Sequence, residues 1–203
     1  MKVNYCARFT MLLLVATLMV LCGCLGRSQP TRFYLLRPTL SLQTGEMLSP
    51  KEGLRIGVGP ISLPEYLDRP QIVTRIGESE LLIDEFNQWA ESLTFSFERI
   101  LAENLSILLF TDNLYVFPWL GSTQIDYQVK VDIIRFNGIP AGKAILETQY
   151  TIFEGGSREI LERNLSTYSR PTDVQNYESL VLSMSQVLED LSREIAEAIK
   201  TLP

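Results

Sequence analysis

Hydrophobic and polar side chains alternate without interruption between Gln124 and Ile133. A period of two places the two sets on opposite faces of an extended chain, and such alternation is typical of an antiparallel strand with one face in water. The hydrophobic set, which we expect to face the core, comprises Ile125, Tyr127, Val129, Val131 and Ile133.

The same period returns twice after this strand. The adjacent pairs Ile133-Ile134 and Arg135-Phe136 break the alternation, which predicts a register shift, and 137–142 is expected to be a loop. Strands are predicted at 143–153 and 159–169, on either side of a turn at Gly155-Gly156. The region therefore predicts a three-stranded antiparallel meander.

Shorter strands are expected upstream of the meander. Pro60 lies inside one of them, and because proline has no N–H to donate, that strand should be an edge strand or carry a bulge. Gly77 separates two others, which predicts a hairpin. The predicted segments are 33–36, 54–63, 71–76, 80–86 and 114–119.

Two segments have helical spacing instead. Apolar residues recur every three or four positions from about Trp89 to Phe110, with Asn87 or Ser92 as candidate N-caps. A second helix is predicted by Leu180, Met184, Val187, Leu188, Leu191, Ile195 and Ile199. The order of elements predicts an α+β fold, a mostly antiparallel sheet with two amphipathic helices packed on one face. The stripe with Trp89 and Phe97 should be core, with hydrophobic-ligand contact as the alternative.

The first 23 residues are expected to be a secretory signal peptide. Lys2 and Arg8 form a basic leader, and residues 9–21 are apolar apart from two threonines. Such a run is shorter than the roughly 20 residues that a transmembrane helix needs. A basic leader followed by a short apolar core is typical of a signal.

Leu21-Cys22-Gly23-Cys24 resembles the bacterial lipobox, Leu-x-Gly-Cys. The resemblance implies cleavage between Gly23 and Cys24, an S-diacylglycerol group on the Cys24 thiol, and an N-acyl chain on the new amino group. Two or more chains give lasting anchorage, whereas one binds a membrane only marginally. The alternative is a plain signal, or an uncleaved anchor with incidental cysteines.

The lipobox also sets the expected domain boundaries. Residues 24–31 would be a lipidated tether, followed by a single domain at 32–203. Leu25 stands where bacterial lipoproteins retained at the inner membrane commonly have aspartate. We therefore expect the protein at the outer membrane, anchored in the lipid bilayer through Cys24 and facing the periplasm.

Composition excludes several classes of function. Cleavage of the signal removes two of the 18 basic residues and none of the 24 acidic ones, so the mature chain would have a net charge of −8. It also has no basic cluster. Nucleic acid is therefore not an expected partner, because binding to phosphates requires clustered lysine and arginine. The chain has no histidine, and its only mature cysteine would be acylated. Histidine-based triads and Cys/His zinc sites are therefore excluded, and a catalytic role would have to rest on carboxylates, hydroxyls or lysines. We expect no metal and no cofactor besides the acyl chains.

One loop stands out as a candidate contact surface. It is bracketed by prolines that restrict its backbone, and it carries two large apolar side chains whose exposure would indicate a partner. The candidate residues are Pro64, Tyr66, Leu67, Asp68, Arg69 and Pro70. Plain packing of the loop on the core is the alternative.

Several stretches together resemble the PqiC-like family, the ABC-type transport auxiliary lipoproteins. Besides the lipobox, they are 33–36, 58–74, the Trp-Ala-x-x-Leu motif of 89–93, 131–138 and the tail from Ile195. The resemblance covers nearly the whole mature chain, and it implies an α+β domain.

The resemblance also implies a function. The chain would be a non-catalytic auxiliary subunit of an MCE-type intermembrane lipid transport system that supports membrane integrity. Its partners would be an MCE-domain protein and the associated inner-membrane transporter subunits, and members of the family can form homo-oligomeric rings. A lipoprotein that helps to assemble an outer-membrane β-barrel machine would share the anchor and the acidic domain, and it is the alternative.

Overall fold

The computed structural model describes residues 9–11, 29–40, 53–77, 79–173 and 176–203. The chain divides into two compact units, residues 1–30 and 31–203. Of the first unit, residues 9–11 form a helical turn. Within the described ranges, no helix combines the length and the apolar character that a membrane span requires. The second unit, in which every further element lies, is described below.

The second unit is built on one mixed sheet. Strand β6 has β7 along one edge, and along its other edge it has β2 and Thr74 of β3, which pairs with Gly138. The strands are β1 (Arg32–Tyr34), β2 (Ile56–Ser62), β3 (Gln71–Arg75), β4 (Leu81–Trp89), β5 (Leu114–Val116), β6 (Tyr127–Gly138), β7 (Lys143–Glu154) and β8 (Ile160–Pro171).

The meander predicted by the period of two is confirmed. Strands β6, β7 and β8 pair antiparallel over nearly their whole length. Tyr127, Val129, Val131 and Ile133 are buried as expected, and the register shifts between Ile133 and Arg135. The loop expected from residue 137 is wrong at its start, because Asn137 and Gly138 still pair with β7.

The strand that contains Pro60 was expected to be an edge strand or to carry a bulge, and strand β2 confirms the bulge. It lies between β5 and β6, both parallel to it, so it is not an edge strand. Its register against β6 shifts between Val58 and Ile61, which is the expected bulge. Parallel pairing also joins β1 to β4. A period of two does not distinguish parallel from antiparallel neighbours.

The predicted hairpin is present as β3 and β4, which pair antiparallel. The predicted start of the first helix at Trp89 is wrong, because Trp89 ends β4, pairs with Tyr34 of β1 and donates its N–H to Pro70. Helix α2 begins at Leu93 after Ser92, whose side chain makes no capping bond. A tertiary strand pairing thus overrides the helical spacing at this end.

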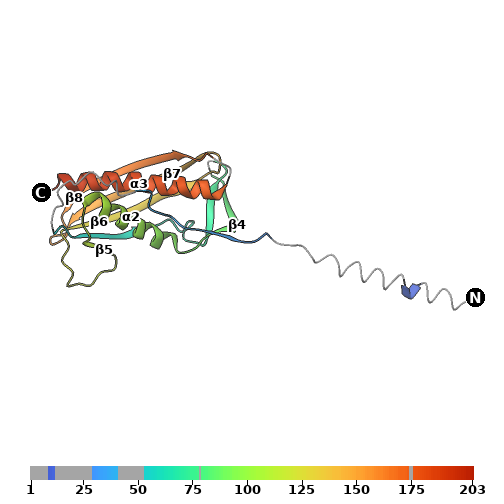
Figure 1. The fold of residues 1–203 in the computed structure, drawn as a ribbon, viewed down its shortest axis with the longest axis horizontal. Helices are drawn as coiled ribbons and strands as arrows, with labels where there is room; N and C mark the ends of the chain where they lie inside the picture. Colours follow the sequence, from blue (N-terminus) through green and yellow to red (C-terminus); the bar gives the residue numbers. More distant parts are fainter. Residues whose placement is uncertain (1–8, 12–28, 41–52, 78, 174–175) are drawn as a thin grey trace, which may run out of the picture. The chain divides into compact units, whose positions relative to one another are not determined.

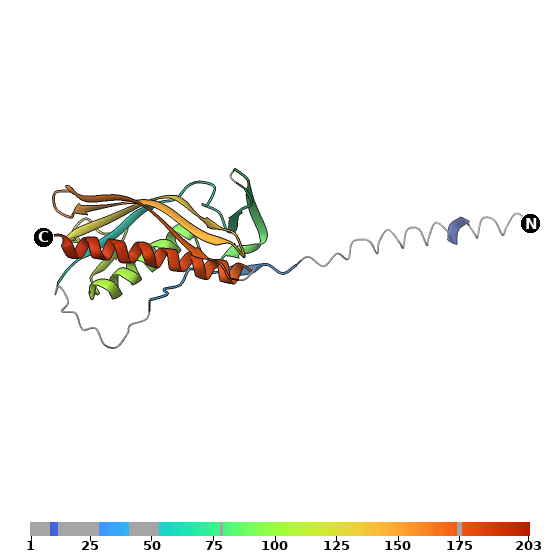
Figure 2. The ribbon, with the colours of Figure 1, turned by 90° about the horizontal axis from the view of Figure 1, so that it is seen from above.

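Helices α2 (Leu93–Leu109) and α3 (Tyr177–Thr201) cover one face of the sheet, as Figures 1 and 2 show. All seven apolar residues predicted for the inner side of α3 are at most 1% exposed. The two helices are joined in the core by Asn104 Nδ2, which donates to Ser192 Oγ at 3.0 Å. The α+β class with both helices on one face is therefore confirmed.

Candidate functional site

The residues expected to carry the lipid anchor, Gly23 and Cys24, lie outside the described residues. The anchor therefore stays a prediction from the sequence.

The loop predicted as a contact surface, Pro64–Pro70, forms a chain of turns. Leu67 N–H donates to the Pro64 carbonyl at 2.9 Å, and Asp68 N–H donates to Glu65 at 3.2 Å. Leu67 is only 2% exposed and belongs to the core, and Tyr66 packs against the core while partly exposed. For Leu67 the packing alternative therefore holds in this structure. Asp68 and Pro70 are exposed, and Pro64 and Arg69 are half-buried.

A shallow hollow of about 340 Å³ lies beside this loop. Its lining joins the end of the loop to the junction between β4 and α2, and it consists of Asp68, Arg69, Pro70, Trp89, Ala90, Glu91, Ser92 and Leu93. At this junction Arg99 Nη2 contacts Glu91 Oε1 at 2.8 Å, and this hydrogen bond holds the pKa of Glu91 below its usual value. The loop thus borders a concave surface with charged groups at its edge.

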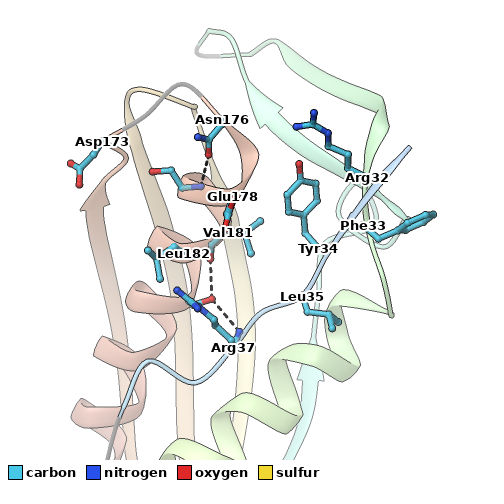
Figure 3. A pocket seen from close by; sticks show the side chains of 12 residues that line it. Arg32, Phe33, Tyr34, Leu35, Arg37, Asp173, Asn176, Glu178, Val181 and Leu182 are labelled. Carbon is cyan, nitrogen blue, oxygen red and sulfur yellow. Dashed lines mark hydrogen bonds between the residues drawn. The ribbon is translucent and has the colours of Figure 1, made fainter. Parts of the chain in front are cut away.

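A larger groove of about 970 Å³ separates the chain at β1 from the first turns of α3 (Figure 3). The groove is lined by Arg32, Phe33, Tyr34, Leu35, Arg37, Asp173, Asn176, Glu178, Ser179, Val181, Leu182 and Ser185. Ser185 Oγ accepts the N–H of Arg37 at 3.3 Å and donates to the Val181 carbonyl at 2.9 Å, which fastens the segment after β1 to α3.

The groove combines charges of both signs with apolar side chains. Arg32 and Arg37 are exposed on the β1 side, while Asp173 and Glu178 are exposed on the α3 side. The N-cap residue Asn176 accepts the Ser179 N–H at 2.7 Å, so its side chain is already used within the helix. The groove therefore has the polarity expected of a surface for an amphipathic, zwitterionic molecule.

An Asp84–Tyr177 contact secures the hairpin to α3 next to this groove. Burial alone would raise the pKa of Asp84, but hydrogen bonds from the Phe86 and Asn87 amides and from the side chains of Asn87 and Tyr177 hold it below its usual value. Burial and then the bond to Asp84 raise the pKa of Tyr177 to about 12. Tyr177 also contacts Tyr34, with ring centroids 6.2 Å apart.

A second carboxylate, Glu194, joins α3 to β8. Asn164 and Ser166 each donate to Glu194 Oε1 at 2.7 Å, and Tyr168 donates to Oε2 at 2.5 Å. Desolvation would raise the pKa of Glu194, but the hydrogen bonds, that of Tyr168 foremost, outweigh it and hold the pKa below its usual value. The ionised carboxylate is therefore the form that the folded protein stabilises.

Replacing this carboxylate by an amide, Glu194→Gln, is expected to lower the free energy of unfolding by about 1.5–3 kcal/mol at pH 7, the range for hydrogen bonds to a charged group. The pKa of Glu194 is lower in the folded than in the unfolded state. The difference in free energy of unfolding between wild type and variant should therefore be largest above the unfolded pKa of about 4.3, and it should vanish as the pH falls through the folded pKa. Urea unfolding at several pH values measures it.

The matched control is Glu197→Gln on the same helix. The Glu197 side chain is 72% exposed and pairs with the nearby Lys200, so its replacement should cost less than about 0.5 kcal/mol. A difference between wild type and Glu194→Gln that stayed constant down to pH 3 would contradict the proposed role of the ionised carboxylate.

A third carboxylate, Glu98 of α2, faces the bulge in β2. Burial raises the pKa of Glu98, and the Ile61 amide opposes this by hydrogen bonding to it. Gly59 has φ +112°, and a Cβ there would lie 2.9 Å from Glu98 Oε1 and 2.7 Å from Phe117 Cβ. Glycine is thus required where this carboxylate approaches the backbone, which gives Glu98 a structural role.

These carboxylates stand apart from one another. Among the residues that the structure describes, no three or more histidine, cysteine, aspartate or glutamate side chains are grouped so as to hold a metal ion. Sequence reasoning missed the groove between β1 and α3, because its walls, which end at Arg37 and begin again at Asp173, are far apart in the chain. The available signal was the segment Phe33-Tyr34-Leu35. In a strand, Phe33 and Leu35 lie on one side and Tyr34 on the other, so two large apolar residues share one side of a short strand.

Comparisons with known proteins agree with one another. A family model described as "ABC-type transport auxiliary lipoprotein component" matches residues 34–196. The intermembrane transport lipoprotein PqiC of Escherichia coli is 27% identical over 184 residues, which cover 90% of this chain and 94% of the relative.

Two solved structures share the fold. One protein described as uncharacterized is 20% identical with a TM-score of 0.67, and the match covers 84% of this chain and 99% of that one. A protein from Xanthomonas campestris is 17% identical with a TM-score of 0.63, and the match covers 81% of this chain and 92% of that one.

Proposed function

The chain belongs to the family of ABC-type transport auxiliary lipoprotein components, and from this premise we propose that it is a non-catalytic, outer-membrane-anchored subunit of an MCE-type intermembrane lipid transport system. The observation that carries the proposal is the similarity to the Escherichia coli intermembrane transport lipoprotein over 90% of the chain. The lipobox at Leu21–Cys24 supports the anchor.

In this proposal the acyl chains on Cys24 hold the protein at the periplasmic side of the outer membrane. Leu25, in place of the aspartate typical of inner-membrane retention, supports that location. The folded domain binds the end of an MCE-domain conduit and, through it, the inner-membrane subunits. It needs no cofactor besides the acyl chains, and several copies would surround the conduit as a ring.

The test is affinity purification of the full-length lipoprotein from detergent-solubilised membranes, with mass spectrometry of the retained proteins. A Cys24→Ser form is the unanchored control. Recovery of an MCE-domain protein supports the proposal. Recovery of a β-barrel, with no MCE-domain protein even after crosslinking, would instead favour the role in outer-membrane assembly.

The exposed part of the Pro64–Pro70 loop is proposed to contact the MCE partner. The charge reversal Asp68→Lys, at an exposed position of the loop, is expected to remove most of the MCE-domain protein from the purified complex, because like charges then meet across the interface. Quantitative mass spectrometry of the purified complex measures it.

The control for the loop is Asp112→Lys, a charge reversal at an exposed position between α2 and β5. It should leave the amount of retained partner unchanged. Equal retention by the loop variant and the wild type would exclude the loop from the interface while leaving the transport role in place.

A further inference from the structure

A set of apolar side chains is exposed at one end of the domain, on β1 and on the β3–β4 hairpin. We refer to it as the β1–hairpin surface. Phe33 is 63% exposed, Ile76 57% and Phe86 40%. The full set is Phe33, Leu35, Ile76, Leu82, Ile83 and Phe86. So many large apolar groups on two neighbouring elements indicate an interaction surface.

The register of β1 and β4 places Phe33 on the side opposite the core. Tyr34 pairs with Trp89 and both side chains pack toward the core, whereas Phe33 pairs with Gln88 on the opposite side. Phe86 is exposed as well, in the part of β4 between Ile83 and Gln88 where the register against β3 shifts. Figure 3 shows Phe33 on the side of β1 away from α3, while Tyr34 lies on the side toward it.

The chain length before β1 limits where this surface can be. Eight residues lead from Cys24 to Arg32, and eight residues reach at most about 28 Å when fully extended. Strand β1 lies at the hairpin end of the domain, and the C-terminus lies at the other end (Figure 1). Since the 25 residues of α3 run about 37 Å along the domain, the tether keeps the hairpin end nearer to the anchor.

The charges beside the surface suit a phospholipid bilayer. Arg32 and Arg37 are exposed on the β1 side of the groove, and Asp173 and Glu178 are exposed on the α3 side. A zwitterionic headgroup offers a phosphate to the arginines and an ammonium group to the carboxylates. A purely acidic end, by contrast, would be repelled by anionic lipids.

We propose that the β1–hairpin surface lies on the bilayer that holds the acyl anchor, with Phe33 and Phe86 in the interfacial region and Arg32 and Arg37 at the lipid phosphates. The inference rests on the proposed function, because it takes Cys24 as the anchor. It adds an orientation: the hairpin end faces the membrane, together with the Pro64–Pro70 loop, whose Pro70 carbonyl accepts the Trp89 N–H at this end. The end with β5 and the C-terminus faces away from the membrane.

A single reporter thiol tests this orientation, because an acylated Cys24 leaves the mature chain without a free thiol. Phe33→Cys and, separately, Phe86→Cys are labelled with a polarity-sensitive fluorophore in the full lipoprotein. The labelled proteins are reconstituted into vesicles of phosphatidylethanolamine and phosphatidylglycerol. Lipids carrying a nitroxide near the headgroup then quench any label that lies in the interface.

The control is Leu120→Cys, in the loop between β5 and β6. Leu120 is 78% exposed, and β6 begins near the C-terminus, since the hydroxyl of Tyr127 donates to Pro203. We expect blue-shifted emission and loss of most of the fluorescence at positions 33 and 86, and unchanged emission at 120. Circular dichroism checks that each variant is folded.

Three results would overturn the inference. Equal and weak quenching at all three positions, with Cys24 shown by mass spectrometry to be acylated, would reject this surface but keep the anchor. Blue-shifted emission at 33 and 86 without lipid quenching would assign the surface to a second copy or another protein. An unacylated Cys24 would reject the anchor and the orientation together.

Discussion

The Cys24→Ser variant is expected to carry no lipid and to be absent from the outer-membrane fraction. Each methylene group of an acyl chain contributes about 0.8 kcal/mol to membrane binding, so two or three chains make detachment negligible, and a serine hydroxyl cannot accept the thioether-linked diacylglycerol. Metabolic labelling with palmitate and separation of inner and outer membranes measure the two effects.

The matched control is Cys22→Ser, two residues upstream in the variable position of the lipobox. It should incorporate palmitate and fractionate like the wild type, since Cys22 would be discarded with the signal. The mass of each product separates a cleaved chain from an uncleaved precursor. Palmitate on Cys24→Ser, or wild-type amounts of that variant in the outer membrane, would show that the anchor lies elsewhere.

The Phe97→Ala variant is expected to lose about 3–5 kcal/mol of stability, the usual cost of removing a buried phenylalanine. Phe97 of α2 and Phe136 of β6 are both fully buried and meet edge to face, with ring centroids 5.5 Å apart and an interplanar angle of 89°. The substitution removes this contact and leaves a cavity between the helix layer and the sheet. Chemical unfolding of the purified protein measures the change.

Phe95→Ala is the control for this prediction, because Phe95 lies on the same helix but is 54% exposed. Its loss should change the free energy of unfolding by less than about 0.5 kcal/mol. Similar losses for the two variants would mean that Phe97 is not part of the core. Since domains are stable by only about 5–15 kcal/mol, the Phe97→Ala protein should also accumulate at a lower level in the cell.

The elements with the longest regular patterns were the ones predictable from the sequence. Helix α3 and the meander β6–β8 each repeat one period over ten or more residues, and the predicted inner residues Leu188, Leu191, Val129 and Val131 are fully buried. Such a period reflects burial of one face against a single layer, which is a local property of the chain.

Boundaries and pairings were less predictable, because they depend on partners distant in sequence. Trp89 fits the helical spacing that continues at Leu93 and Phe97, yet it ends a strand because Tyr34 pairs with it. Residues 137 and 138 look like the start of a turn, yet β7 extends the ladder to them. Tertiary hydrogen bonds decided these cases against the local pattern.

The candidate sites also differ in whether the local sequence or only the tertiary structure reveals them. The lipobox at Leu21–Cys24 and the family motifs can be recognised from residue identity and order alone, because an acylation site is read by enzymes as a short linear segment. The sequence by itself therefore determined the class of protein and its expected anchor, as well as the α+β class of its fold.

Only the tertiary structure decided which surfaces are available for contact. It buried Leu67 while leaving Asp68 exposed, it brought Arg37 next to Ser185 to form one side of a groove, and it left Phe33 exposed while Tyr34 packed inward. Exposure depends on how much neighbouring surface other elements cover, and those elements lie far away in the chain. That dependence on distant packing is the physical reason why the surfaces could not be read from the sequence.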